Sequence, residues 1–551
     1  MPLARRILSQ ATRLSNNWLV RDSFAALGLT VLYLILVLKE MPLEPWQNFF
    51  YHWSGSASNF FVPVALNILA VWFVIMLPLL FTRKPGRTRV AIWTGLILLT
   101  SCVYTHLNIF YHRLSFLNLG SVAFIGAVSI TFVLTALWRP ELDGRYERVL
   151  APVTTILIFL GIFGAFLLCN LALHGWEGHL FAKRSTLHSQ QASGTIQPHR
   201  IIWIVFDELS QQETYDHRFP DLQLPAFDAL AAGATTFTHT QPFDIYTEVV
   251  LPGLLTGKPF DDMRTSATLQ LSLHNTATGK WQKFDQYDTV FQDALHAGYS
   301  TALAGWYNPY CRILPGVLDK CFWTYEDHGQ TIMSPSATTL SNTLVLGRSL
   351  VISPMTMMPH RMGTYLVNLL HSPLISGEAE DRELHIKDYI DLNTASDKLL
   401  RDRSAGFVLL HLPVPHPQGI YDRKTGNLAT TPSSYIDNLA LADKCLAGIR
   451  ATLEQTGQWD SSTIVIMGDH SWRTWQEWRR FPQWTKEDEL VSHDGQYDPR
   501  PAYIVKLPGQ TTGSVINTPY HTVNTRKLFD AIMAHQITTP AELAAWAQNM
   551  H

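Results

Sequence analysis

Five long apolar stretches occupy the N-terminal part of this 551-residue chain. Each of the last four is long enough to cross a hydrocarbon core of about 30 Å as a helix. The first follows a basic segment and could be a signal peptide, but no small-residue cleavage pattern follows it and further stretches do. The third is diluted by polar residues such as Thr105 and His106. The predicted membrane helices are Phe24 to Leu38, Phe60 to Phe81, Val90 to Phe110, Leu114 to Trp138 and Val149 to Leu173.

Basic residues are distributed unevenly between these stretches, which predicts the orientation of the helices. Two loops are rich in Lys and Arg, whereas the alternate loops hold only Lys39 and Arg113. Because basic loops stay in the cytoplasm, the N-terminus is expected inside and everything after His174 outside. We expect a transmembrane domain over residues 1–175, a linker over 176–197 and an extracytoplasmic domain over 198–551. The basic residues of the two rich loops are Arg83, Lys84, Arg87 and Arg89, then Arg139, Arg145 and Arg148.

From about Pro198 onward, short β-branched runs alternate with segments of helical periodicity, which is typical of an α/β domain. A terminal helix is expected after Thr539, because Pro540 and Glu542 complete a capping pattern. The predicted strands are Ile201 to Phe206, Ser300 to Gly305, Gly406 to Leu412, Thr463 to Met467 and Ala502 to Lys506. The other predicted helices are Leu224 to Ala232, Asp288 to Ala297 and Tyr435 to Thr456.

Two of these strands end in acidic and imidazole side chains. The run PHRIIWIVFDELS passes from its strand into Asp207 and Glu208, and TIVIMGDH ends in Asp469 and His470. The ligand crevice of an open α/β sheet lies outside the carboxyl ends of the strands. Alone, the first run could be a strand that surfaces at an acidic turn. With the second strand end it predicts a metal site, and carboxylates with an imidazole suit zinc or manganese better than calcium.

Three further residues are candidates by position. Thr247 comes ten residues before Gly257, where a turn into a helix would expose its hydroxyl and the helix start could hold an anion. Most threonines before a helix are only caps, so this signal is weak by itself. His416 follows the strand that ends at Leu412, and His493 precedes the strand that begins at Ala502.

Charge and cysteine content narrow the function classes. A formal net charge of −3 argues against a nucleic-acid partner. Cys311 and Cys321 flank the short segment RILPGVLDK, which a disulfide could close in an oxidising compartment; free thiols are the alternative. Cys102 and Cys169 lie within predicted spans, and Cys445 has no evident partner.

These motifs together resemble a known superfamily. FDE after a strand, a nucleophile position followed by LLTG, a strand ending in DH and a late histidine before a strand form the pattern of the alkaline phosphatase and sulfatase superfamily. Five spans before an exported domain resemble most its membrane-anchored phosphotransferases, the phosphoethanolamine transferases and lipoteichoic acid synthases. The resemblance implies a five-helix membrane domain followed by an α/β alkaline-phosphatase-like domain.

The resemblance also implies roles for individual residues. The sulfatase signature CxPxRxxLLTG ends at Gly257, which puts the nucleophile at Thr247. A sulfatase needs cysteine or serine there, for conversion to formylglycine, whereas the phosphotransferase branch uses threonine. Glu208 matches a second acidic residue of sulfatases that phosphotransferases commonly lack. The implied metal ligands are Asp207, Thr247, Asp469, His470 and Glu208, and the implied catalytic residues are Thr247, His416 and His493.

The function implied is transfer of a phospholipid head group through a phospho-threonine, with Zn²⁺ or Mn²⁺ as cofactor. Phosphoethanolamine is favoured over phosphoglycerol, and an envelope glycan or lipid is the acceptor. We expect a monomer in the inner membrane of a bacterium, with its catalytic domain in the periplasm. The alternatives are a membrane-anchored phosphodiesterase or sulfatase-like hydrolase and a non-catalytic glycan-binding protein.

One segment departs from the family pattern. The phosphoethanolamine transferases usually continue DHGE, whereas this chain reads DHSW and continues with a tryptophan- and arginine-rich stretch from Trp472 to Trp484. Such a stretch could bind a phosphorylated glycan, lie at the membrane interface or form a packed surface lobe.

Overall fold

The structure is a computed structural model, and its chain divides into two compact units. One unit comprises the described residues within 1–45, 55–182 and 331–375, and the other those within 46–54, 183–330 and 376–551. The structure describes residues 18–34, 46–47, 51–53, 56, 58–82, 88–97, 130–131, 134–135, 138, 143–181, 199–266, 270–325, 333, 337–352, 378–475, 478–480 and 484–550.

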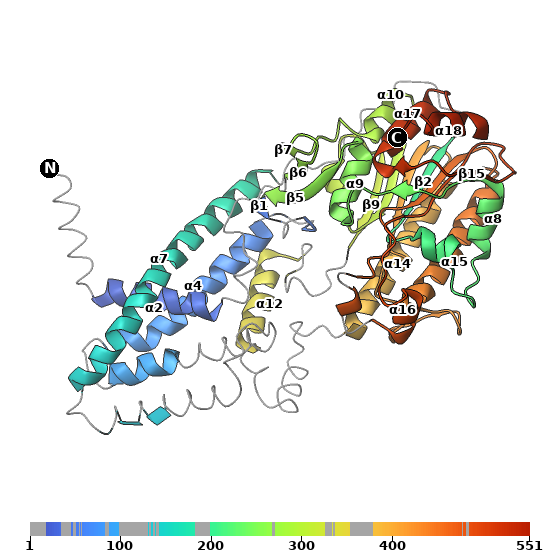
Figure 1. Ribbon diagram of the computed structural model, residues 1–551. Helices are drawn as coiled ribbons and strands as arrows, with labels where there is room; N and C mark the ends of the chain where they lie inside the picture. Colours follow the sequence, from blue (N-terminus) through green and yellow to red (C-terminus); the bar gives the residue numbers. More distant parts are fainter. Residues whose placement is uncertain are drawn as a thin grey trace. The chain divides into compact units, whose positions relative to one another are not determined.

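The first unit is helical (Figure 1). Its labelled helices are α2 (Trp18–Tyr33), α4 (Ser58–Leu80), α7 (Asp143–Phe181) and α12 (Thr339–Ile352). Helices α2 and α7 approach closely at two glycines: a Cβ on Gly28 would meet the carbonyl of Leu157, and one on Gly161 would meet the carbonyl of Phe24. Small residues at such contacts are common between membrane helices.

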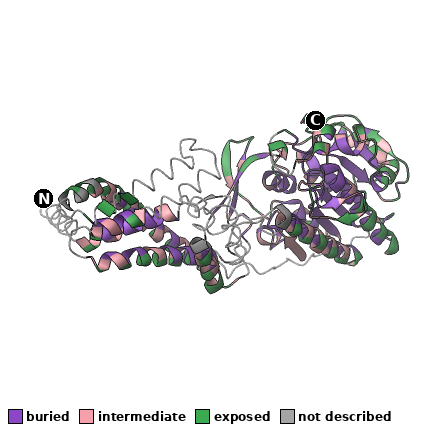
Figure 2. Cartoon of the chain, turned by 90° about the horizontal axis from the view of Figure 1, so that it is seen from below, coloured by how far each residue is buried: buried purple, intermediate pink, exposed green. Residues whose placement is uncertain are grey.

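Two of these helices are long and apolar enough to cross a membrane, namely α4 and the part of α7 from Leu150 to Trp176. Both expose large apolar side chains such as Val74 and Phe159, as expected of a surface that faces lipid. Figure 2 shows exposed residues along the helices of this unit. They coincide with the second and fifth predicted spans. Residues 98–110 and most of 114–138, which carry the third and fourth, lie outside the described residues. The count of five spans therefore stays a prediction.

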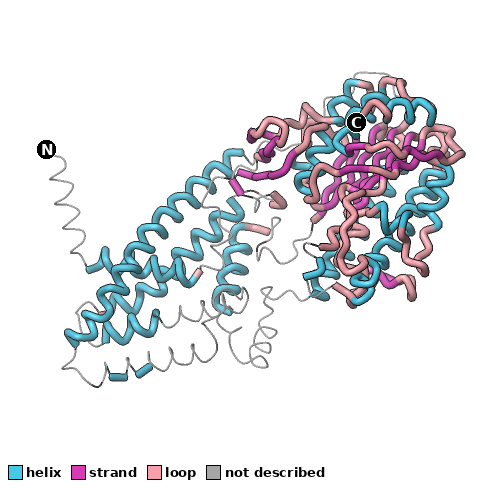
Figure 3. The backbone as a smooth tube through the Cα atoms, viewed as in Figure 1, coloured by secondary structure: helices cyan, strands magenta, loops and turns pink. Residues whose placement is uncertain are grey.

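The second unit is built on an eight-stranded mixed sheet of order β15-β3-β14-β13-β2-β10-β8-β9 (Figure 3). The predicted α/β class is confirmed, and each predicted strand lies within one or two residues of an observed one. Strands β13, β2, β10, β8 and β9 are parallel, and β14 runs antiparallel to β13. The strands are β2 (Ile201–Phe206), β3 (Thr235–Phe237), β8 (Thr301–Trp306), β9 (Lys320–Thr324), β10 (Phe407–Leu412), β13 (Thr463–Gly468), β14 (Tyr503–Lys506) and β15 (Ser514–Ile516).

Helices cover both faces of this sheet, which explains why its central strands are mostly apolar. In β2, Trp203 and Val205 face one core and Ile202 and Ile204 the other. The first core includes side chains of α9 (Thr247–Thr256), α10 (Val290–His296), α17 (Thr525–Met533) and α18 (Pro540–Ala547). The second includes side chains of α8 (Pro225–Gly233), α14 (Glu378–Arg401) and α15 (Tyr435–Gln455). The predicted capping box of the terminal helix forms at Thr539.

Strand register brings three strand ends to one edge of the sheet. Phe206 pairs with Leu412 on one side and with Gly468 on the other. The chain therefore leaves β2, β10 and β13 at the same level, and the residues that follow them meet.

Two connections hold the segments beside this edge. The predicted disulfide forms between Cys311 and Cys321, with Cα atoms 5.6 Å apart, and ties α11 (Tyr310–Ile313) to β9. A second sheet of order β1-β5-β6-β7 attaches β1 (Trp46–Gln47) to β5 (Phe260–Ser266), beside β6 (Leu271–Asn275) and β7 (Lys280–Lys283). The described residues 46–47 and 51–53, which lie between α2 and α4 in sequence, thereby belong to the second unit.

Candidate active site

Thr247 is the first residue of α9 and lies between the ends of β2 and β13. Its hydroxyl donates to Asp469 Oδ2 at 2.8 Å, and its Oγ1 lies 3.3 Å from Asp207 Oδ2 and 3.2 Å from His470 Nε2. The apolar side chains of α9 pack on the sheet and fix the position of the helix. The helix ends at Gly257, whose φ of +66° suits glycine. The candidate nucleophile is thus held by packing with its oxygen among three polar groups.

Asp469 and His470 are oriented by backbone groups. The N–H of Glu208 donates to Asp469 Oδ1 at 3.0 Å. His470 Nδ1 lies 3.0 Å from the carbonyl oxygen of Ser471, which can only accept, so Nδ1 carries the proton. His470 Nε2 therefore presents its lone pair toward Thr247.

The carboxyls of Asp207 and Asp469 are fully buried, and both have a raised pKa. Burial is the main cause for each, and the neighbouring carboxylates Asp469 and Glu208 raise the pKa of Asp207 further. Asp207 Oδ1 has no hydrogen-bond partner among the described residues. Burial also lowers the pKa of His470 to about 4, which keeps its ring neutral at pH 7. The neutral imidazole of His470 does not balance the negative charge of the two buried carboxylates. Two carboxylates and an imidazole are, however, suitable ligands for a divalent metal.

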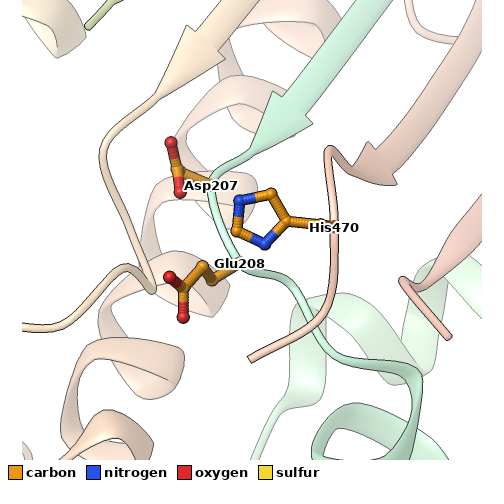
Figure 4. A group of neighbouring side chains, drawn as sticks. All are labelled: Asp207, Glu208 and His470. Carbon is orange, nitrogen blue, oxygen red and sulfur yellow. The ribbon is translucent and has the colours of Figure 1, made fainter. Parts of the chain in front are cut away.

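The spacing of these atoms also fits a metal. Donors bound at about 2.0–2.1 Å in a tetrahedral site lie about 3.3 Å from one another. The Oγ1 of Thr247 lies at 3.2–3.3 Å from His470 Nε2 and Asp207 Oδ2, and His470 Nε2 lies 3.3 Å from Asp469 Oδ2. In Figure 4 the ring of His470 points toward the carboxylates of Asp207 and Glu208. The residues present fit a divalent cation and leave the choice between zinc and manganese open.

Glu208 has a different environment from the two aspartates. Its backbone is left-handed, with φ +62°, and its carboxylate accepts from Arg473 Nε at 2.7 Å and from Trp478 Nε1 at 3.0 Å. Its ligand atom still lies within 4.8 Å of those of Asp207 and His470. Arg473 already balances the negative charge of Glu208. A bound metal would therefore stabilise the Glu208 carboxylate less than it would stabilise the Asp207 carboxylate.

The described residues of the tryptophan- and arginine-rich stretch, 472–475, 478–480 and 484, pack beside the site. Trp472 is buried and stacks on Tyr435 and Trp484, with ring centroids 4.2 and 5.4 Å away. Trp478 and Arg473 reach Glu208, as described above. These contacts are those of a packed lobe whose inner side chains orient Glu208.

The two late histidines have different surroundings. His416 follows β10, with Nε2 4.0 Å from Glu208 Oε1 and its ring against Trp306 and Trp478. His493 follows α16 (Lys486–Val491), and its side chain is exposed. Within the described part of the chain, no contact joins His493 to Thr247, Asp207 or Asp469. The structure therefore brings His416 to the site and leaves His493 outside it.

The sequence analysis missed a further histidine. His411 lies within β10, fully buried, with Nε2 3.4 Å from Asp207 Oδ2. It forms a possible metal group with Asp207 and Asp469. The available signal was a histidine in the otherwise apolar strand FVLLHL, on the same face as Phe407 and Leu409.

A family model described as Sulfatase matches residues 199–491, which is more than half of the chain. The chain belongs to the sulfatase family. The resemblance to the alkaline phosphatase and sulfatase superfamily is thereby confirmed, and members of this superfamily are enzymes. The matched residues include Asp207, Thr247 and Asp469. A search of curated proteins found no match.

Solved structures that resemble the chain come from the same superfamily. The lipoteichoic acid synthase LtaP from Listeria monocytogenes is 13% identical, with 60% of this chain and 70% of that chain covered and a TM-score of 0.32. The phosphonate monoester hydrolase SpPMH from Silicibacter pomeroyi is 14% identical, with 64% and 77% covered and a TM-score of 0.37. An alkaline phosphatase superfamily protein from Vibrio parahaemolyticus is 12% identical, with 63% and 69% covered and a TM-score of 0.36. The family assignment rests on the family model alone.

Loss of single carboxylates should remove the metal. Asp207→Asn keeps the shape of the side chain but removes a charged ligand, so purified protein should lose stoichiometric zinc or manganese in elemental analysis. Metal addition should stabilise the wild type by about 3 kcal/mol at 100 times its Kd and stabilise the variant much less. Asp443→Asn, a buried carboxyl on α15 that accepts from the N–H of Phe227, is the control and should keep its metal. Stoichiometric metal in Asp207→Asn would contradict the site.

The Glu208–Arg473 pair should be strongly coupled. Arg473→Met leaves the buried Glu208 carboxylate uncompensated and should lower the free energy of unfolding by about 3–5 kcal/mol. Adding Glu208→Gln should recover most of this loss in a double-mutant cycle measured by denaturant unfolding. Arg401→Met, which breaks the exposed pair with Asp397, should cost no more than about 1 kcal/mol. An equal loss in Arg473→Met and Arg401→Met would show that Glu208 is not held as described.

Proposed function

We propose that this protein is a membrane-anchored, metal-dependent phosphotransferase. It moves the head group of a phospholipid onto an envelope glycan or lipid through a phospho-threonine at Thr247. The observation that carries the proposal is the set of contacts around Thr247 Oγ1, which lies within 3.3 Å of Asp207, Asp469 and His470 at the start of a helix. A hydroxyl so placed has the surroundings of an activated nucleophile.

The identity of the nucleophile favours phosphoryl transfer over sulfate ester cleavage. Threonine cannot be converted to the formylglycine that sulfatases of the family use. Thr247 can instead form a phosphate ester directly, and the N–H groups of the first turn of α9 favour an anion beside it. The sulfatase family therefore supplies the fold, and Thr247 favours phosphoryl transfer over sulfate ester cleavage within it.

In the first step, Thr247 Oγ1 attacks the phosphorus of a lipid phosphodiester. The bond from phosphorus to the diacylglycerol oxygen breaks, and the proton of the Thr247 hydroxyl ends on the departing diacylglycerol. When a divalent metal is bound, it lowers the effective pKa of the Thr247 hydroxyl and stabilises charge on the phosphoryl oxygens. Asp207, Asp469 and His470 are the residues that would hold it.

In the second step, an acceptor hydroxyl attacks the phosphorus of phospho-Thr247. The Oγ1–phosphorus bond breaks, Thr247 regains a proton and the acceptor hydroxyl loses one. His416 is better situated than His493 to carry this proton, because it lies beside Glu208 with its side chain 17% exposed. Access from solvent to a histidine at the edge of the buried site suits an incoming acceptor.

A phospholipid donor requires the site to work at a membrane. Helices α4 and α7 can anchor the protein, and a disulfide between Cys311 and Cys321 agrees with an oxidising periplasm. We propose a monomer that spans the bacterial inner membrane five times, with no nucleic-acid partner. Glu248, next to the nucleophile and hydrogen-bonded to Tyr307, could receive an ammonium group, which favours phosphoethanolamine over phosphoglycerol.

Substitution of the nucleophile tests this proposal. Thr247→Ala in full-length protein should abolish the release of diacylglycerol from phosphatidylethanolamine micelles supplied with Mn²⁺ or Zn²⁺. Thr247→Ser, which keeps the hydroxyl, should retain part of it. Thr256→Ala, at the other end of α9, is the control and should retain full activity.

Two outcomes would overturn the proposal. Full diacylglycerol release by Thr247→Ala would exclude a threonine nucleophile. Free phosphoethanolamine as the only product, in the presence of acceptor glycan or lipid, would make the protein a hydrolase.

A further inference from the structure

His411 is fixed in one tautomer by its neighbours. Its Nδ1 lies 3.0 Å from the carbonyl oxygen of Trp306 and 2.9 Å from the hydroxyl of Tyr310. Because a carbonyl oxygen can only accept, Nδ1 carries the proton, and Nε2 must present a lone pair.

That lone pair faces the metal site without a donor. His411 Nε2 is buried and has no hydrogen-bond partner among the described residues, and the same holds for Asp207 Oδ1. Its closest polar contact that the structure gives is Asp207 Oδ2, an acceptor, at 3.4 Å. Two acceptors facing each other in a buried site are unfavourable unless a cation binds both.

The distance fits such a cation. An imidazole nitrogen and a carboxylate oxygen bound to one zinc at about 2.0–2.2 Å lie about 3.4 Å apart in tetrahedral geometry. We propose that His411 Nε2 is a ligand of the same metal as Asp207, Asp469 and His470, an inference that rests on the metal centre of the proposed function. The protein then offers two carboxylates and two imidazoles, with Thr247 beside them.

The charges of the site indicate one metal and not two. Glu208 is balanced by Arg473, with which it forms a buried ion pair. Asp207 and Asp469 remain, and their two negative charges are balanced by a single divalent cation. Glu208 therefore serves to hold Arg473 and the lobe, while His411 takes the coordination position that sequence reasoning gave to Glu208.

A chain of buried hydrogen bonds supports His411 from behind. Tyr310 OH contacts His411 Nδ1 and lies 3.3 Å from Asn308 Nδ2. Asn308 Oδ1 accepts from Tyr51 OH at 2.8 Å, and Asn308 Nδ2 also lies 3.3 Å from the carbonyl of Thr247. All of these side chains except that of Thr247 are fully buried.

This series of hydrogen bonds makes Tyr51 a positioning residue for the site. Tyr51 lies in the segment between α2 and α4, and Arg312 donates to its carbonyl. The series of hydrogen bonds therefore starts at Tyr51, which lies in sequence between two apolar helices. At its other end it orients the proposed metal ligand His411 and the backbone of Thr247. Groups that orient a metal-bound histidine typically affect metal affinity about 10–100-fold.

X-ray absorption spectroscopy of full-length, Zn²⁺-loaded protein tests the ligand. The wild type should show one zinc per chain with two imidazole nitrogens, and His411→Gln should show one imidazole and bind zinc at least about tenfold more weakly in competition with a chelator. His385→Gln, a buried histidine stacked on Trp306, is the control and should keep two imidazoles. One imidazole in the wild type, two zinc ions per chain, or two imidazoles in His411→Gln would overturn the proposal.

If His411→Gln does not fold, substitutions in the hydrogen-bond series behind His411 still test the proposal. Tyr51→Phe and Tyr310→Phe remove only hydroxyl groups and should weaken zinc binding about tenfold while two imidazoles remain. Tyr299→Phe, a buried tyrosine beside the start of β10, should leave the affinity unchanged. Unchanged affinity in both Tyr51→Phe and Tyr310→Phe would overturn the positioning role. Because these readouts need no substrate, a protein with two imidazoles but no diacylglycerol release would overturn the proposed function alone.

Discussion

The two buried carboxylates Asp207 and Asp469 carry like charge, and the rest of the site has to compensate that charge. The parallel register of β2 and β13 brings them together at one edge of the sheet, out of reach of water. Taking two such charges out of water costs several kcal/mol each unless a cation accompanies them. The imidazoles of His411 and His470 and the hydroxyl of Thr247 lie beside these carboxylates and could serve as further ligands of such a cation.

The surrounding fold serves to hold these side chains in place. Helix α9 packs on the sheet through apolar side chains and fixes Thr247, and the pair of Glu208 with Arg473 keeps a third carboxylate from adding to the unbalanced charge. The disulfide ties α11, which carries Tyr310, to the sheet. Support of this kind lets a metal site keep its geometry.

Strand chemistry made part of this site predictable from the sequence. Asp207, Asp469 and His470 follow buried β-branched runs, so the rule for strand ends located them, and Thr247 followed from the resemblance. His411 was missed because it lies inside a strand, where only its register with β2 shows that it faces the same site. The pairing of Glu208 with Arg473 depends on how the lobe folds back, which no local pattern encodes. His493 precedes β14, but residues 494–502 separate it from the strand and its side chain is exposed.

The most direct test of the central claim is the mass of the covalent intermediate. Full-length protein, loaded with metal and mixed with phosphatidylethanolamine in the absence of acceptor, should be quenched in acid, digested and analysed by mass spectrometry. We expect a phosphoethanolamine adduct on the peptide that contains Thr247, located on that residue by fragmentation. A phosphoglycerol adduct, obtained only with phosphatidylglycerol, would change the donor and leave the mechanism standing. An adduct on another residue, or turnover with no adduct on Thr247, would contradict the account.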